Sequence, residues 1–177
     1  MIKTRSYVGF SADSPLKFYE FNRRELGEHD VHIKIKYCGI CHSDIHTVRN
    51  EWGGAVYPLV PGHEIVGVVE KVGAKVTRYQ PGATVGVGCM VGISPQPHPV
   101  SSKSLIFKQK NLSGSLIGGI AETQEMLNYC GKHQIECDIE IIPIQKINEA
   151  YERVMRGDVQ YRFVIDMQSL QDDHLPV

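Results

Sequence analysis

Apolar and polar residues alternate strictly over residues 31–37, VHIKIKY, a period that is typical of a strand with one buried face. Two further segments, 64–73 and 83–88, are rich in valine and glycine and are also predicted to be strands. The first ninety residues are therefore β-rich. Strands at this spacing favour a small barrel or sandwich.

The pattern changes beyond residue 91. Prolines stand at every second position of the segment Gly92 to Val100, which cannot propagate a helix or a central strand and is predicted to be a linker. Alternating helical and extended patterns follow, and they predict a strand near 111–119, a helix over about 122–133, a strand at 139–143, a helix at 147–156 and a strand at 161–166. The helix at 147–156 has one apolar stripe, formed by Ile147, Ala150, Tyr151, Val154 and Met155.

Composition narrows the class of protein only loosely. The chain has 177 residues, 42% of them hydrophobic and 22% charged, which fits one globular domain or one domain with part of another. A formal net charge of -1 provides no basic surface for nucleic acid. No signal core and no run of about 20 apolar residues is present, so we expect a cytoplasmic protein without membrane contact.

The most informative stretch runs from Cys38 to Glu64. Cys41 is predicted to lie in a short polar loop after the alternating strand, and His63 and Glu64 follow on a Pro-Gly turn. Zinc is bound in proteins by such thiolate, imidazole and carboxylate groups. The Cys38–Cys41 pair alone would also fit a zinc ribbon or a redox pair, but no second C-x-x-C follows, and Cys38 is predicted to be a small buried residue. Five cysteines at irregular spacing fit reduced thiols and a metal site.

Several motifs resemble one family. GICHSDIH, VPGHEIVGVV and VGVGC in the first half, and GSLIGGIAETQEML and INEAYERVMRGDVQYRFVID in the second, are similar to the medium-chain, zinc-dependent alcohol dehydrogenases. The similarity is greatest to the aldehyde reductases that are like cinnamyl alcohol dehydrogenase. It extends over about 1–91 and 92–170 and implies a GroES-like barrel as the catalytic domain.

The resemblance implies a catalytic zinc bound by Cys41 and His63. Glu64 is implied to be the adjacent carboxylate that enters the coordination sphere when the substrate oxygen is absent. In such enzymes the metal polarises an aldehyde, or lowers the pKa of an alcohol, so that hydride passes to or from a nicotinamide. The implied cofactors are therefore Zn²⁺ and NADP(H), and the implied substrate is a small alcohol or aldehyde.

The neighbouring residues acquire roles through the same resemblance. Ser43 and His46 match a hydroxyl-to-imidazole proton relay, and Asp44 matches the group that orients the histidine ligand through its other ring nitrogen. The alternative for Ser43 and Asp44 is that they only cap or satisfy the loop backbone.

Three more positions correspond to ligand contacts in the family. His42 and Arg162 match residues that face the pyrophosphate of the cofactor, and Trp52 matches the substrate pocket. Both Arg162 and Trp52 also have explanations without a ligand. Arg162 is then a strand residue with a solvated head group, and Trp52 only packs within its loop.

The chain also departs from the family. A central Rossmann domain of about 150 residues has no counterpart here, and with it are lost a third cysteine ligand and a lobe of four closely spaced cysteines. Cys89, Cys130 and Cys137 do not reproduce that lobe. The glycines at 86, 88 and 92 imitate a dinucleotide fingerprint, but they lead into the prolines rather than into a helix, so they are not a dinucleotide site.

These observations predict an α+β fold, mainly β, with a GroES-like catalytic domain formed by 1–91 and 136–177. Residues 92–135 are predicted to be a linker and a remnant of the Rossmann domain, its last strand and helix. We expect NADP(H)-linked interconversion of primary alcohols and aldehydes by ancestry, impaired or absent in this chain, with weak zinc binding and no NADP(H) binding. The alternative is a non-catalytic GroES-like zinc-binding or assembly module. Apolar residues within 105–117 predict self-association into a dimer or larger assembly.

Overall fold

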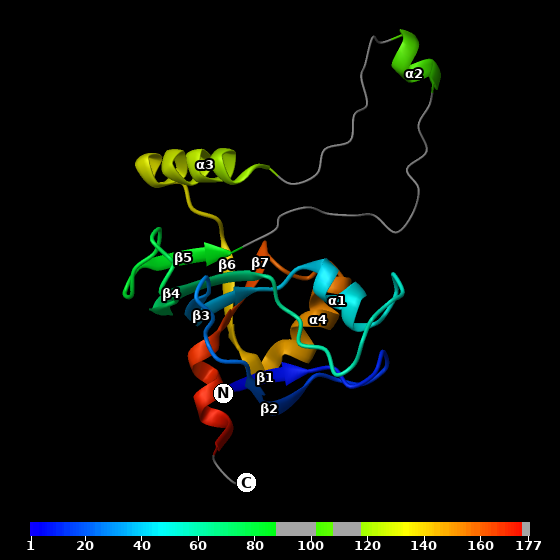
Figure 1. Ribbon diagram of the computed structural model, residues 1–177. Coiled ribbons are helices and arrows are strands. Elements are labelled where there is room, and N and C mark those ends of the chain that lie inside the picture. The colour runs from blue at the N-terminus through cyan, green and yellow to red at the C-terminus, as the bar shows by residue number, and fades with distance from the viewer. Residues whose placement is uncertain (88–101, 108–117, 175–177) are drawn as a thin grey trace. The chain divides into compact units, whose positions relative to one another are not determined.

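The computed structural model describes residues 1–87, 102–107 and 118–174 (Figure 1). The chain divides into two compact units, one formed by Met1–Gly88 with Cys137–Val177 and the other by Cys89–Glu136. The predicted linker at 92–100, most of the predicted strand at 111–119 and most of the segment 105–117 lie outside the described residues.

The first unit contains a five-stranded sheet that joins distant parts of the sequence. Its strands are β3 (Val31–Gly39), β4 (Glu64–Val72), β5 (Thr84–Val87), β6 (Ile139–Pro143) and β7 (Arg162–Asp166), in the order β5-β4-β3-β7-β6. All neighbours are antiparallel except β6 and β7, which are parallel. The strands predicted from the period-two and valine-rich patterns are confirmed, and β7 pairs with β3 so that the C-terminal segment completes the N-terminal sheet.

A second, two-stranded sheet was not predicted strand by strand. It pairs β1 (Ile2–Val8) with β2 (Lys17–Arg23) in antiparallel register. These strands mix charged residues with apolar ones because neither face is buried throughout, so their periodicity is weak.

Cys41 lies in the short loop after β3, as predicted, and an unpredicted helix follows it directly. Cys41 is the N-cap of α1 (His42–Val48), and its backbone N–H donates to Asp44 Oδ2 at 3.1 Å. An acidic side chain at the third helical position that accepts from the N-cap backbone is one half of a capping box. The sequence analysis did not predict α1, because this capping pattern was not recognised in CHSD.

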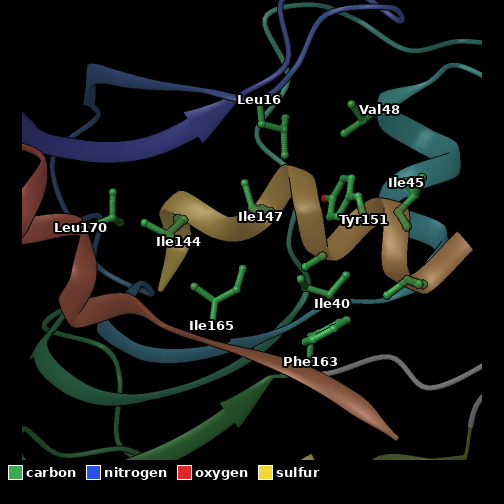
Figure 2. Close-up of a cluster of buried hydrophobic side chains, with 12 residues drawn as sticks. Leu16, Ile40, Ile45, Val48, Ile144, Ile147, Tyr151, Phe163, Ile165 and Leu170 are labelled. Atoms are coloured by element: carbon green, nitrogen blue, oxygen red, sulfur yellow. The ribbon is translucent and has the colours of Figure 1, made fainter. Parts of the chain in front are cut away.

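The hydrophobic core forms around α4 (Ile147–Met155), as Figure 2 shows. Ile147, Ala150, Tyr151 and Val154 are buried as the stripe predicts, but Met155 is 40% exposed. The 3-10 helices η1 (Ile144–Lys146) and η2 (Met167–His174) border α4 and β7. The core cluster also contains buried residues of β7, α1 and the flanking loops, namely Leu16, Ile40, Ile45, Val48, Ile144, Phe163, Ile165 and Leu170.

The described residues of the second unit are helical. They form α2 (Ser102–Phe107) and α3 (Ile120–His133), which begins two residues before the predicted helix. No side chain of α3 is buried. Sheet and helix are thus mixed, with sheet predominant in the first unit, and the predicted α+β, mainly β class is confirmed. Among the described residues, no helix has the length and apolar character needed to cross a bilayer.

Candidate metal centre

Three side chains from adjoining elements converge at one end of the five-stranded sheet. Cys41 caps α1, His63 lies on the turn before β4, and Glu64 is the first residue of β4. One ligand atom of each residue lies within 4.8 Å of the others. A sulfur, a ring nitrogen and a carboxylate oxygen therefore surround one point, and this donor set is one that zinc accepts.

Asp44 holds the two loops of this cluster together. Its carboxylate is 5% exposed and accepts from the Cys41 N–H at 3.1 Å, from the Gly62 N–H at 2.9 Å and lies 3.0 Å from His63 Nδ1. A proton on Nδ1 completes the third bond and leaves Nε2 with its lone pair free for a metal. The predicted orienting contact between Asp44 and His63 is therefore present as geometry.

The hydroxyl of Ser43 lies at the same point. Ser43 Oγ donates to Cys41 Sγ at 3.2 Å and lies 3.3 Å from His63 Nε2. It thus touches both of the atoms that the resemblance assigns to zinc. A group bound between these atoms would lie next to the hydroxyl.

Glu64 is held on one side only. Its Oε2 lies 3.2 Å from Arg162 Nη1, which also donates to the Ile40 carbonyl at 3.0 Å. Its Oε1 is buried and has no hydrogen-bond partner. Buried carboxylate oxygens are rarely left unpaired, and this one belongs to the residue that completes the Cys41–His63 pair, so the residues present fit a divalent metal.

Backbone geometry at two glycines accommodates this arrangement. A Cβ at Gly39, which pairs with Glu64 across β3 and β4, would lie 2.5 Å from Glu64 Oε2. Gly62 precedes His63 with a φ of +110°, in the region that favours glycine. Larger residues at these positions would displace the Glu64 carboxylate or strain the turn that carries His63.

The remaining predicted site residues gather along α1. His46 is buried, and its Nδ1 bonds to Glu51 Oε2. His42 is exposed, and its ring stacks on that of His46 with 5.7 Å between the ring centroids. The ring of Trp52 also contacts His46, with 5.2 Å between the centroids. Within the described part of the chain, no hydrogen bond joins Ser43 to His46. Arg162 is placed beside the cluster through Glu64 rather than free in solvent.

Glu51 is a partner that the sequence analysis did not identify. It lies five residues after His46, beyond the three- and four-residue spacings by which partners on one helix are recognised. Cys38, by contrast, is buried as predicted, and burial together with the carboxylates of Asp44 and Glu64 raises the pKa of its thiol to about 11.

Comparisons with known proteins identify the family. Residues 27–129 match the family described as alcohol dehydrogenase GroES-like domain. Cinnamyl alcohol dehydrogenase 8 of Arabidopsis thaliana is 66% identical, over 84% of this chain and 91% of the relative. Aldehyde reductase YahK of Escherichia coli (strain K12) is 28% identical, over 97% of this chain and 100% of the relative.

Those two alignments are 326 and 349 positions long, whereas the chain has 177 residues. Each alignment therefore includes many internal positions at which this chain has no residue. The matched segments lie on both sides of such gaps.

Solved structures show the same fold. A cinnamyl alcohol dehydrogenase from Sorghum bicolor superposes with a TM-score of 0.84 at 21% identity, covering 93% of this chain and 98% of that one. The cinnamyl alcohol dehydrogenase of Helicobacter pylori, solved in complex with NADP(H), superposes with a TM-score of 0.77 at 22% identity, covering 94% and 99%. The predicted GroES-like fold is confirmed, and the chain belongs to the family of zinc-dependent alcohol dehydrogenases and aldehyde reductases that share the alcohol dehydrogenase GroES-like domain.

Proposed function

We propose that this chain is the zinc-binding catalytic domain of an NADP(H)-linked alcohol dehydrogenase or aldehyde reductase, and that Cys41, His63 and Glu64 are its zinc ligands. The observation that carries the proposal is the convergence of their three ligand atoms within 4.8 Å, with one buried carboxylate oxygen left unpartnered. A bound zinc would polarise the oxygen of an alcohol or aldehyde.

The chain's own residues then have distinct tasks. Asp44 fixes the ring of His63 through Nδ1, so that Nε2 faces the cluster. Ser43, whose hydroxyl contacts Cys41 Sγ and His63 Nε2, exchanges a proton with a substrate oxygen bound there. We assign the next step of the relay to His46, whose ring Glu51 holds at Nδ1. A bound group must link it to Ser43, since no hydrogen bond joins the two in the described part of the chain.

Contacts to the cofactor and the substrate are also part of the proposal. We assign His42 and Arg162 to the pyrophosphate of NADP(H), and Trp52 to the wall of the substrate pocket, because His42 and Trp52 are exposed beside the cluster and Arg162 borders it. We infer that the domain that would hold the rest of the cofactor corresponds to alignment positions at which this chain has no residue. Zinc binding is therefore expected to be weak, and hydride transfer impaired or absent in this chain by itself.

That gap favours a second function. A GroES-like module that binds zinc and assembles with other chains, without catalysis, needs only the first unit. Exposed Ile106 and Phe107 on α2, which are 73% and 78% exposed, support self-association through this part of the second unit. We expect either form to act in the cytoplasm, on no nucleic acid or membrane.

Paired measurements on one sample separate these functions. Elemental analysis is expected to give one zinc per chain, lost in Cys41→Ala and His63→Ala and retained in the control Cys137→Ala, whose thiol is exposed. NADPH fluorescence enhancement, followed by turnover of an aromatic aldehyde, tests the enzyme. NADPH binding or turnover supports the enzyme, zinc with neither is the result expected of the isolated domain and of the module alike, and a folded protein that binds no zinc refutes the proposal.

A further inference from the structure

The first unit contains a partly open cavity that the proposed zinc site does not use. Its volume is about 570 Å³, within the range of small-molecule pockets, and residues of both sheets and of α4 line it. Much of its wall consists of isoleucines, namely Ile35, Ile40, Ile65, Ile144, Ile147 and Ile165. The wall is therefore mainly apolar.

The cavity is separate from the metal cluster. Asp44 and Gly62 contribute to its wall, but Cys41, His63 and Glu64 do not. The hydrogen bonds of Asp44 to Cys41, Gly62 and His63 turn its carboxylate towards the cluster. A molecule in the cavity would lie behind the turn that carries His63 without touching the proposed ligands.

Tyr151 supplies a polar group to this cavity. Its side chain belongs to α4, is only 6% exposed and lines the cavity (Figure 2). Its hydroxyl makes no hydrogen bond to any residue in the described ranges, unlike that of Tyr57, which donates to the Val48 carbonyl at 2.6 Å. Among the described residues, Glu64 Oε1 is the one fully buried polar side-chain atom without a partner, so the Tyr151 hydroxyl keeps some accessible surface. It is therefore a donor that a molecule in the cavity can pair.

The surroundings of Tyr151 determine what it can bind. Burial and the nearby Asp44 and Cys38 groups raise the pKa of Tyr151, so its hydroxyl remains neutral and able to donate. Of the three arginines that line the cavity, Arg5 and Arg24 are paired with Glu20 and Asp30, and Arg23 is exposed at the end of β2. A charged ligand would be costly among the isoleucines, whereas a neutral acceptor oxygen would satisfy the hydroxyl.

We propose that this cavity is a binding site for an uncharged, mainly apolar small molecule with one hydrogen-bond-accepting oxygen, which accepts from the Tyr151 hydroxyl. An aromatic ketone is the simplest member of this class. The site is additional to the proposed zinc centre and does not depend on it.

The test compares two probes that differ in one oxygen, 2-acetylnaphthalene and 2-ethylnaphthalene, titrated by calorimetry into chelator-treated protein. The ketone is expected to bind about five- to tenfold more tightly than the hydrocarbon, the effect of one net hydrogen bond. Tyr151→Phe is expected to remove this preference and leave the affinity for the hydrocarbon unchanged. The control Tyr161→Phe removes a hydroxyl from a 70% exposed side chain that does not line the cavity, and should change neither affinity.

His63→Ala distinguishes the cavity from the zinc centre, because a ketone carbonyl could also bind there. Ketone affinity is expected to be unchanged in this variant, and intermolecular nuclear Overhauser contacts should join the ketone to the methyl groups of Ile65 and Ile165. Loss of binding in His63→Ala, equal binding of the two probes, or binding of neither probe by the folded protein would each overturn the proposal.

Discussion

Asp44 is the residue at which a small substitution should lower the stability of the site most. Asp44→Asn preserves the shape of the side chain but replaces one carboxylate oxygen by an amide group. Oδ1 accepts from Gly62 and lies next to His63 Nδ1, and Oδ2 accepts from Cys41. An asparagine has one acceptor oxygen, so at least one of these bonds is lost, and the amide then faces a backbone N–H.

The size of the effect follows from those contacts. A hydrogen bond to a charged group contributes about 1.5–3 kcal/mol, and a buried donor left without an acceptor costs about 1–3 kcal/mol. Both figures describe the loss of the same hydrogen bond, so they are not fully additive. We therefore expect Asp44→Asn to lower the free energy of unfolding by about 2–4 kcal/mol. The loss should be present in zinc-free protein, since each partner belongs to the chain.

Urea denaturation in the presence of a chelator measures this quantity. The matched control is Asp158→Asn, which removes a carboxylate from a 63% exposed partner of Arg153 and should cost less than about 1 kcal/mol. Zinc titration of the same variants should show an affinity about 10–100-fold lower for Asp44→Asn only. If the unfolding free energies of Asp44→Asn and the wild type agree within about 0.5 kcal/mol, Asp44 does not hold the two loops together.

Three further predictions concern other parts of the chain. Gly67→Ala places a Cβ 2.6 Å from a side-chain methyl and from a backbone carbonyl of β3, and should destabilise by about 1–3 kcal/mol in denaturation; Gly86→Ala, whose nearest neighbour is at 3.9 Å, should not. Because the folded pKa of Cys38 is about 11 and its unfolded value is near 9, the unfolded state loses this proton first, and stability should fall between pH 9 and 11. Over this pH range, the free energy of unfolding should fall by about 2–3 kcal/mol more in the wild type than in Cys38→Ala. An equal pH dependence of the two proteins would show that Cys38 is not the titrating group. Phe107→Glu on α2 should weaken self-association in sedimentation velocity, and an unchanged distribution would exclude this surface.

The sequence predicts those parts of the fold in which one face of an element is buried. The stripe in 147–156 has this origin, and α4 lies where its period places it. The alternation in 31–37 correctly predicts strand β3, but Ile35 and Tyr37 on its apolar face are 37% and 38% exposed. Strands β1 and β2 have no such contrast, and Met155 lies at the edge of the stripe, where periodicity cannot distinguish a core residue from an exposed one.

The site likewise has residues that the sequence identifies and contacts that it does not. The spacing of Cys41, His63 and Glu64 and the adjacent Asp44 are local features of two loops, so the motifs identify them. The contact of Arg162 with Glu64 depends instead on the pairing of β7 with β3, which joins residues more than a hundred positions apart. No local pattern encodes that register, and the cavity beneath the turn is likewise a product of tertiary packing.

Glu64 is the residue at which structural and metal-binding roles can be separated. In metal-free protein, Glu64→Gln weakens the pair with Arg162 but also removes the negative charge from the side chain that carries a buried, unpartnered oxygen. Because these terms oppose each other, we expect the free energy of unfolding to change by less than about 1 kcal/mol. Zinc affinity should fall at least about tenfold, since a neutral amide is a poorer ligand than a carboxylate. Glu140→Gln is the matched control, because Glu140 also pairs with an arginine of this unit, at 2.9 Å, away from the cluster. A large loss of stability with unchanged zinc affinity would make Glu64 a structural partner of Arg162 and leave the metal with two protein ligands.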